Sequence, residues 1–311
     1  MDSLDVIGDI HGHADALEAL LGELGYAESG GAWRHPSRHA VFVGDFVDRG
    51  PRQLDAVDIV RRMRDAGTGS ACMGNHEFNA IAWFEGARAH TPANRSQHSA
   101  FLDAVGEGSA LHRELVGWFA SLPLWLDLPA LRVVHACWDP ASMAVLAPLL
   151  DRYGALTTHG LGRTFDRDDP AFAAHEIVLK GPEAALPPGI SFADSYGHVR
   201  HRTRIAWWDP ALATFRQAAM LDRATRERLP DDPLPAAARI AQVPGKPVLF
   251  GHYWMRGEPD ILTPQAACLD FSVAAGGSLA AYRHDGEPRL DRSRIAHVPF
   301  DARPAEALAL A

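Results

Sequence analysis

The sequence contains few cysteines, almost no lysine and no long hydrophobic segment. Its three cysteines, Cys72, Cys137 and Cys268, show no paired spacing, which argues against a disulfide framework or a zinc knuckle and favours a reducing compartment. No apolar run approaches the roughly 20 residues that a membrane-spanning helix needs, and the N-terminus leads straight into a strand pattern without the features of a signal or transit peptide. We therefore expect a cytoplasmic protein that does not associate with membranes.

The balance of charge limits the possible partners. The 311-residue chain has a formal net charge of −9, which argues against nonspecific binding to nucleic-acid backbones, although a local cationic pocket could still attract a phosphate. Of its 30 basic residues only Lys180 and Lys246 are lysines, and we attribute this to coding composition rather than to function.

A strand pattern followed by a helix pattern occurs twice near the N-terminus. A buried strand at 4–7 precedes leucines with helical spacing at 14–24, and a strand at 40–43 precedes an amphipathic helix at 54–64. The remaining predictions are a helix at 111–122 and strands at 71–73, 131–134, 247–250, 267–269 and 279–282. This order predicts an α/β fold whose ligands bind beyond the carboxyl ends of the strands.

The pattern loosens between residues 138 and 245, where prolines are frequent. We interpret about 139–245 as an insertion or cap that shapes the substrate cleft. The sequence becomes polar after Tyr282, so that about 284–311 forms a C-terminal tail whose last residues, 305–311, are frayed or make a short helix. The whole chain, 1–311, is then a single domain, a size that α/β domains often reach.

Short polar clusters follow five of the predicted strands, and most of them combine glycine with aspartate, asparagine or histidine. Singly, each cluster is most simply a turn. The clusters are Gly8-Asp9-Ile10-His11-Gly12, Gly44-Asp45-Phe46-Val47-Asp48-Arg49-Gly50, Gly74-Asn75-His76-Glu77, Val134-His135-Ala136 and Gly251-His252. Because open α/β sheets place their ligands beyond the carboxyl ends of the strands, these clusters should converge.

Taken together and in this order, the clusters resemble the motifs of the calcineurin-like metallophosphoesterase superfamily: GDxHG, GDxVDRG, GNHE, a strand-end histidine and a later Gly-His. The resemblance extends from about Asp5 to Tyr282. It points to the phosphoprotein-phosphatase branch, near bacterial serine/threonine phosphatases and dinucleoside-tetraphosphate hydrolases. It implies a four-layer α/β/β/α sandwich, the metallo-dependent phosphatase fold, with a cap-like insertion.

The resemblance also implies a centre of two divalent metal ions. Six residues would be the ligands: Asp9 and His11 for the first ion, Asp45 bridging both ions, and Asn75, His135 and His252 completing the second site. Independently of the resemblance, carboxylate, amide and imidazole ligands suit Mn²⁺, iron or Zn²⁺, and no cysteine is placed to favour a softer ion. We expect manganese first, with a hydroxide between the two ions attacking the phosphorus.

The catalytic assignments follow from the same motifs. His76 adjoins the ligand Asn75 and is the predicted general acid, while Asp48 orients its imidazole and favours the protonated form. The guanidinium of Arg49 can donate two hydrogen bonds to phosphate oxygens. The competing interpretation is a salt bridge to Asp48 or to a surface aspartate.

A second substrate-binding arginine is expected from the insertion. The segment 203–208 faintly resembles a segment of bacterial dinucleoside-tetraphosphate hydrolases, and it makes Arg204 the candidate. Four neighbouring cations compete with it, and a solvated charged strand is the alternative. The competitors are Lys180, His198, Arg200 and Arg202.

Other residues near the motifs are assigned supporting roles. Asp270 is interpreted as an acceptor that orients a ligand rather than as a ligand. Trp207 and Trp208 could stack on a nucleobase, but a tryptophan pair is more often part of a core, so we leave both out of the site. Cys137 follows the strand-end His-Ala where relatives often have glycine, and it either narrows the site or can be oxidised.

Three functions are compatible with this sequence. The first is hydrolysis of phosphate monoesters by a serine/threonine-type protein phosphatase, and the second is hydrolysis of dinucleoside polyphosphates or nucleotide-capped RNA ends. The third is a noncatalytic phosphate-binding protein that kept the fold, which the complete set of ligand and acid residues disfavours. The expected partner is therefore a phosphorylated protein or a nucleotide.

Overall fold

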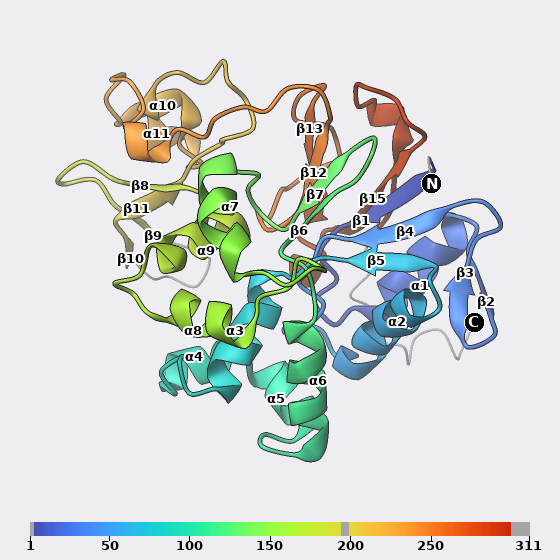
Figure 1. Cartoon of the computed structure of the whole chain (residues 1–311). Coiled ribbons are helices and arrows are strands. Elements are labelled where there is room, and N and C mark those ends of the chain that lie inside the picture. Colours follow the sequence, from blue (N-terminus) through green and yellow to red (C-terminus); the bar gives the residue numbers. More distant parts are fainter. Residues whose placement is uncertain (1–2, 194–198, 300–311) are drawn as a thin grey trace, which may run out of the picture.

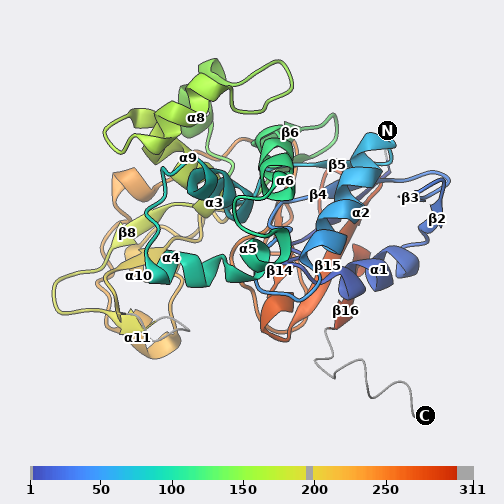
Figure 2. The same cartoon turned by 90° about the horizontal axis from the view of Figure 1, so that it is seen from below.

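The computed structural model describes residues 3–193 and 199–299 of the chain. Two main β-sheets lie face to face, and helices cover the outer side of each (Figure 1). In the view from below, α1 (Ala14–Glu23) and α2 (Gln53–Asp65) lie on one side of the molecule, and α9 (Pro170–Lys180) lies on the other (Figure 2).

The first sheet contains the strands that carry the N-terminal clusters. Its strands are β1 (Leu4–Ile7), β4 (His39–Phe42), β5 (Gly69–Ala71), β14 (Asp270–Phe271), β15 (Ser278–His284) and β16 (Ile295–Pro299). Strands β1, β4 and β5 run parallel, while β1, β14 and β16 each pair antiparallel with β15. The loops that follow β1 and β4 therefore leave the sheet at the same edge.

The second sheet contains the strands that carry the two late histidine clusters. Its strands are β6 (Trp125–Asp127), β7 (Arg132–Val134), β12 (Val248–Phe250) and β13 (Ala266–Cys268). Strand β12 pairs parallel with both β7 and β13, and β6 is antiparallel to β7. The ends of β7 and β12 thus lie side by side.

The alternation of buried side chains along the strands establishes the layers. Val41 and Val43 of the β4 segment pack with Leu249 of β12 in a core between the two sheets. Phe42, which points the opposite way, packs with Leu17 of α1 in a core between sheet and helices. Because successive strand residues face opposite sides, each sheet is buried on both faces, and the predicted α/β/β/α sandwich is confirmed.

The helices of the described residues cover the sheets and build the insertion. Besides α1, α2 and α9 they are α3 (Asn75–Phe84), α4 (Pro92–Gln97), α5 (Ser99–Val105), α6 (Ala110–Ala120), α7 (Pro140–Leu146), α8 (Thr158–Phe165), α10 (Phe215–Ala218) and α11 (Arg223–Glu227). Short strands complete the list: β2 (Ala27–Ser29), β3 (Ala32–Arg34), β8 (Glu183–Ala185), β9 (Phe192–Ala193), β10 (Val199–Arg200) and β11 (Arg202–Arg204). Within the described ranges, no helix combines the length and the apolarity that crossing a bilayer requires.

The predicted insertion consists of two differently packed parts. Ala174 and Val178 of α9 belong to the same core as Phe250 of β12, so that this part of the chain is built into the sandwich. A separate small core, which includes Ala184 and Ile205, lies under the short strands and α10. This second part has a core of its own, as a cap added to the sandwich would have. Its role at the substrate cleft stays a prediction.

The end of the chain differs from the predicted tail in one respect. Residues 295–299 form β16, which pairs with β15 over five positions from Ser278↔Pro299 to Tyr282↔Ile295. Part of the region expected to be a tail is therefore an edge strand of the first sheet. The expected frayed end or helix at 305–311 lies outside the described residues.

Candidate active site

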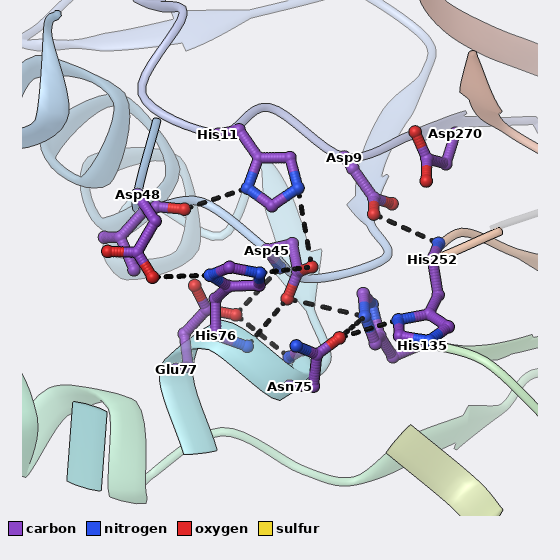
Figure 3. A network of polar contacts seen from close by, with 12 residues as sticks. Asp9, His11, Asp45, Asp48, Asn75, His76, Glu77, His135, His252 and Asp270 are labelled. Atoms are coloured by element: carbon purple, nitrogen blue, oxygen red, sulfur yellow. Dashed lines mark hydrogen bonds and ion pairs between the residues drawn. The ribbon is translucent and has the colours of Figure 1, made fainter. Parts of the chain in front are cut away.

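The six predicted ligands come together at the edge where the two sheets meet. Asp9 and His11 follow β1, Asp45 follows β4, and Asn75 begins α3. His135 follows β7 and His252 follows β12, so both sheets contribute to one site (Figure 3). Residues separated by more than 200 positions in the sequence are thus neighbours because parallel strands end together.

Asp45 occupies the middle of this site. Its Oδ2 lies 3.6 Å from Nε2 of His11 and 3.9 Å from Nε2 of His76, while its Oδ1 lies 3.4 Å from Nε2 of His135. Asp45 is accordingly shared by two groups of candidate metal ligands, one with His11 and His76 and the other with His135 and His252. In each group the ligand atoms lie within 4.8 Å of one another.

The imidazoles are held in the orientation that metal ligands need. Nδ1 of His11 lies 2.9 Å from the carbonyl oxygen of Val47, and Nδ1 of His135 lies 2.9 Å from that of Val43. Because a carbonyl only accepts hydrogen bonds, each Nδ1 carries a proton, so Nε2 is the ring nitrogen that would bind a cation when the imidazole is neutral. This fixes the tautomer that binds a cation.

The remaining polar atoms also fit a cationic centre. Asn75 Oδ1 lies 3.1 Å from Nε2 of His135 and 2.7 Å from Nδ1 of His252. Asp9 Oδ2 accepts a 3.0 Å hydrogen bond from the backbone N–H of His252, but its Oδ1 is buried without a hydrogen-bond partner. Nε2 of His11 is buried without a hydrogen bond as well. Buried acceptors of this kind need a partner, and bound cations would supply it.

The charges of the site depend on one another. Burial would raise the pKa of Asp45, but the positive potential of His135 and His76 holds it well below its usual value. Burial likewise acts to lower the pKa of His135, and the carboxylate of Asp45 outweighs it and raises the pKa to about 10. Burial and the neighbouring Asp270 raise the pKa of Asp9. A bound cation would replace the proton on His135, because a metal ligand must be neutral imidazole.

Two glycines of the motifs are required by close contacts. A Cβ atom at Gly74 would lie 2.2 Å from Oδ1 of Asp45, and one at Gly251 would lie 1.9 Å from Oδ1 of Asp9. Neither position can accept a side chain without moving a carboxylate of the site. The Gly-Asn and Gly-His pairs of the sequence therefore reflect backbone that passes directly against Asp45 and Asp9.

Strained backbone is concentrated at the same place. Five site residues have φ between 48° and 75°, a region that costs a residue with a side chain about 1 kcal/mol or more. They are His11, Asp45, Asp48, Arg49 and His252. Strain of this kind persists where surrounding contacts impose it, and it accumulates at functional sites.

Comparison with known proteins agrees with this geometry. The model of the calcineurin-like phosphoesterase family matches residues 3–170. The chain belongs to this family. An asymmetrical bis(5′-nucleosyl)-tetraphosphatase, PrpE of Halalkalibacterium halodurans, is 32% identical over 139 residues, covering 42% of this phosphoesterase and 56% of that protein. PrpE of Bacillus subtilis is 38% identical over 137 residues, covering 42% and 56%.

The phosphoesterase thus spans about half the length of the curated relatives it matches. Among solved structures, a protein serine/threonine phosphatase from Saccharomyces cerevisiae with similarity to human phosphatase PP5 aligns with a TM-score of 0.54 at 15% identity. The alignment covers 97% of this chain and 80% of that one, so the two proteins share the fold over nearly the whole phosphoesterase.

His76 and Asp48 of the phosphoesterase form the contact that the sequence predicts. Nδ1 of His76 lies 2.5 Å from Oδ2 of Asp48. Burial acts to raise the pKa of Asp48, but the hydrogen bond and the charge of His76 lower it to about 2. Burial acts to lower the pKa of His76, and the carboxylates of Asp45 and Asp48 raise it above its ordinary value. The pair therefore favours an imidazolium at this position.

His98 is a site residue that sequence reasoning missed. Its Nδ1 lies 2.7 Å from Oδ1 of Asp48, so the two oxygens of Asp48 contact two different imidazoles. His98 is buried and stands between α4 and α5, after no strand and within no motif. The sequence therefore carries no local signal that would have identified it.

The two predicted arginines contact neighbouring residues of the loop that follows β12. The guanidinium of Arg49 lies 4.2 Å from the centre of the Trp254 ring, and that ring is 6.1 Å from the ring of His11. Arg204 donates a 3.2 Å hydrogen bond from Nη1 to the carbonyl oxygen of His252 and lies 5.7 Å from the ring of Tyr253. Trp254 was not predicted, although it follows the Gly-His motif by only two residues.

The competitors of Arg204 have other positions. Arg202 forms an ion pair with Glu183 at 3.3 Å and is exposed. Arg200 is exposed on β10, and His198 lies outside the described residues. Burial lowers the pKa of His252, and the positive charges of Arg204 and His135 lower it further. Lys180, the fourth competitor, stands at the end of α9.

The supporting residues behave largely as predicted. Asp270 accepts hydrogen bonds from the backbone N–H groups of Trp254 and Ser272, at 2.7 and 3.0 Å, and so orients the loop that follows His252 rather than the side chain of a ligand. Trp207 donates to the carbonyl oxygen of Ala136 at 3.0 Å and is buried, as is Trp208. Both are core residues.

Cys137 does not narrow the site of the phosphoesterase, because its side chain belongs to the main hydrophobic core. Burial raises the pKa of its thiol well above the ordinary value, and the nearby Asp139 adds to this effect. A buried thiol is a poor target for oxidation, which requires an accessible thiolate.

Glu77 links the GDxVDRG and GNHE motifs through hydrogen bonds. No role was assigned to it from the sequence. Its carboxylate accepts hydrogen bonds from the backbone N–H groups of Asp45 and Phe46, both at 2.8 Å, and of Gly74 at 3.0 Å. The side chain is fully buried. It therefore fixes the loop after β4 against the start of α3.

We expect Glu77→Ala to lower the free energy of unfolding by about 3 kcal/mol or more, because three buried N–H groups lose a charged acceptor. Urea denaturation measures the loss. Glu85→Ala, at the exposed end of the same helix, is the matched control and should change stability by less than about 0.5 kcal/mol. Equal effects of the two substitutions would contradict the role given to Glu77.

Proposed function

We propose that this phosphoesterase hydrolyses dinucleoside tetraphosphates at a centre of two divalent metal ions. The observation that supports the reaction most strongly is the position of Asp45, whose oxygens lie 3.6 Å from His11 Nε2 on one side and 3.4 Å from His135 Nε2 on the other. The substrate class is supported by the curated relatives, which are named asymmetrical bis(5′-nucleosyl)-tetraphosphatases.

The ligands proposed for the two ions are those predicted from the motifs. Asp9 and His11 hold the first ion, Asp45 is shared, and Asn75, His135 and His252 hold the second. Manganese is the first candidate, with iron and zinc as alternatives, because the donors are carboxylate, amide and imidazole. When bound, two such ions supply the positive charge that makes a water molecule acidic and polarises a phosphoryl group.

The phosphoesterase itself supplies an acid for the leaving group. The carboxylate of Asp48 keeps the Nδ1 proton of His76, 2.5 Å away, and leaves Nε2 on the side of Asp45. The raised pKa of His76 keeps a proton on that nitrogen as well. His76 then donates the Nε2 proton to the departing oxygen, while Arg49 and Arg204 bind the phosphoryl oxygens.

A serine/threonine protein phosphatase is the second candidate function. The GDxVDRG and GNHE motifs favour it, as they are typical of the phosphoprotein-phosphatase branch that the sequence resembles. Both candidates use the same central residues, so only the substrate separates them.

We expect the Mn²⁺-loaded protein to hydrolyse diadenosine tetraphosphate with a kcat/KM at least about tenfold above that for a phosphoserine peptide, because specificity is a ratio of these constants. Chromatography of the nucleotide products and release of phosphate from the peptide give the two values. A higher value for the peptide would favour the second candidate. Turnover of neither compound, nor of an aryl phosphate, would support the noncatalytic alternative.

A further inference from the structure

Lys180 and Arg204 are brought to the same side of the site by the first strands of the insertion. Helix α9 ends at Lys180, and β8 begins three residues later at Glu183. Strand β8 pairs with β11 so that Glu183 lies opposite Arg204, and the N–H of Ile205 donates to the carbonyl oxygen of Pro182 at 3.0 Å. The end of the helix and the arginine are therefore adjacent.

Arg204 and Gly181, the residue after Lys180, both lie against Tyr253, the residue that follows His252. Gly181 packs so closely on Tyr253 that a Cβ atom there would lie 1.9 Å from the hydroxyl oxygen, and its φ of 78° turns the chain away from α9. The guanidinium of Arg204 lies 5.7 Å from the ring of the same tyrosine. The guanidinium of Arg204 and the end of α9 thus lie on the His252 side of the site, whereas Arg49 lies near His11 beside Trp254.

The partner of Lys180 is one that an anion could replace. Its ammonium forms an i,i+4 ion pair with Glu176, and the side chains of both residues are 34% exposed. Glu176 also lies 3.2 Å from Nε2 of His175 and would keep a partner if the lysine turned away. Ion pairs of this exposure contribute little to stability, because water screens the two charges.

We propose that Lys180, beside Arg204, forms a second anion site that binds the phosphoryl group adjacent to the one attacked. This assignment rests on the proposed function. It specifies that the site binds a second phosphoryl group of the substrate. A dinucleoside tetraphosphate carries several anionic phosphoryl groups in a row, whereas a monoester carries one. A further cation therefore increases affinity for the polyphosphate much more than for the monoester.

The other lysine of the chain, Lys246, is a matched control. Its side chain is 30% exposed and forms an ion pair with Asp127, much as Lys180 does with Glu176. Lys246 precedes β12, whereas His252 follows it, so Lys246 lies at the end of this strand away from His252. The chain has no third lysine.

The experiment is competitive acetylation of the Mn²⁺-loaded full chain, followed by mass spectrometry of the peptides that contain Lys180 and Lys246. The protecting probe is methylenediphosphonate, which carries two linked phosphonate groups that resist hydrolysis, and methylphosphonate is the one-group control. We expect methylenediphosphonate to slow acetylation of Lys180 at least about fivefold relative to Lys246, and methylphosphonate to change neither. Equal protection of the two lysines, or protection by both probes alike, would overturn the proposal.

Steady-state kinetics of Lys180 variants test the anion site independently of acetylation. Lys180→Ala should raise KM for diadenosine tetraphosphate about tenfold with little change in kcat, and its effect on 4-nitrophenyl phosphate hydrolysis should be several times smaller. Lys246→Ala should alter the hydrolysis of neither substrate. Glu176→Gln removes the ion-pair partner of Lys180 and should lower KM for the tetraphosphate. An equal loss on both substrates in Lys180→Ala would contradict an anion site.

Different results would refute the proposed function and the Lys180 anion site. Protection of Lys180 in a protein that does not hydrolyse the tetraphosphate would refute the proposed function and uphold the anion site. Hydrolysis of the tetraphosphate without selective protection of Lys180 would uphold the function and refute the anion site.

Discussion

Asp45→Asn is expected to reduce hydrolysis of an aryl phosphate by about a thousandfold or more, since the charge shared between the two proposed ions is lost. The Asn side chain keeps an oxygen that can accept the 2.9 Å hydrogen bond which the backbone N–H of His76 makes to Oδ1. The shape of the site should therefore survive while its charge changes. The measurement is kcat for 4-nitrophenyl phosphate at saturating Mn²⁺.

Asp139→Asn is the control for this substitution. Asp139 is also buried, but it caps α7 by accepting from the backbone N–H groups of Ala141 and Ser142 and takes no part in the candidate site. Because Asn caps a helix about as well as Asp, the replacement should cost less than about 1 kcal/mol of stability and leave kcat within about twofold. An Asp45→Asn protein that keeps the activity of the Asp139→Asn protein would rule out Asp45 as the shared ligand.

His76→Ala should harm poor leaving groups far more than good ones, because only a basic leaving oxygen needs a proton as it departs. We expect a loss of about 100-fold or more in kcat/KM for an alkyl phosphate such as phosphoserine peptide, and about tenfold or less for 4-nitrophenyl phosphate. His39→Gln, which replaces a buried histidine bonded to Ser70 at 2.9 Å, is the control. Equal losses on both substrates would argue against an acid role.

The pH dependence of activity on the alkyl phosphate also tests the acid role of His76, and its direction follows from the shifted pKa. The carboxylates of Asp45 and Asp48 raise the pKa of His76 against the effect of burial, so the acid is present below that raised pKa and is lost as the pH rises through it. Activity on the alkyl phosphate should therefore fall on the alkaline side. Asp48→Asn removes one of the raising charges and should move this fall to lower pH.

The candidate site was predictable from the sequence because its signals are local. Each ligand follows a short apolar strand, and Asp9, Asp45 and His135 each stand within three residues of the strand that positions them. Strand ends can be read from period-two burial and from glycine. Parallel pairing within each sheet, together with the packing of the two sheets face to face, then brings the residues together.

Other features depend on contacts that no local pattern records. His98 meets Asp48 only because α4 and α5 lie against the site, and α4 has no buried residue whose spacing would predict it. Arg202 and Arg204 are two residues apart on β11, so strand alternation places them on the same face. The sequence therefore could not separate the arginine that bonds His252 from the one that pairs with Glu183.

The number of metal ions bound per chain tests the central claim most directly. After equilibrium dialysis against Mn²⁺, elemental analysis of the unmodified protein should give about two ions per chain. The Asp45→Asn protein should hold fewer, and the Asp139→Asn protein should match the unmodified chain. A chain that binds no Mn²⁺, iron or zinc, or that binds two ions regardless of Asp45, would contradict the account.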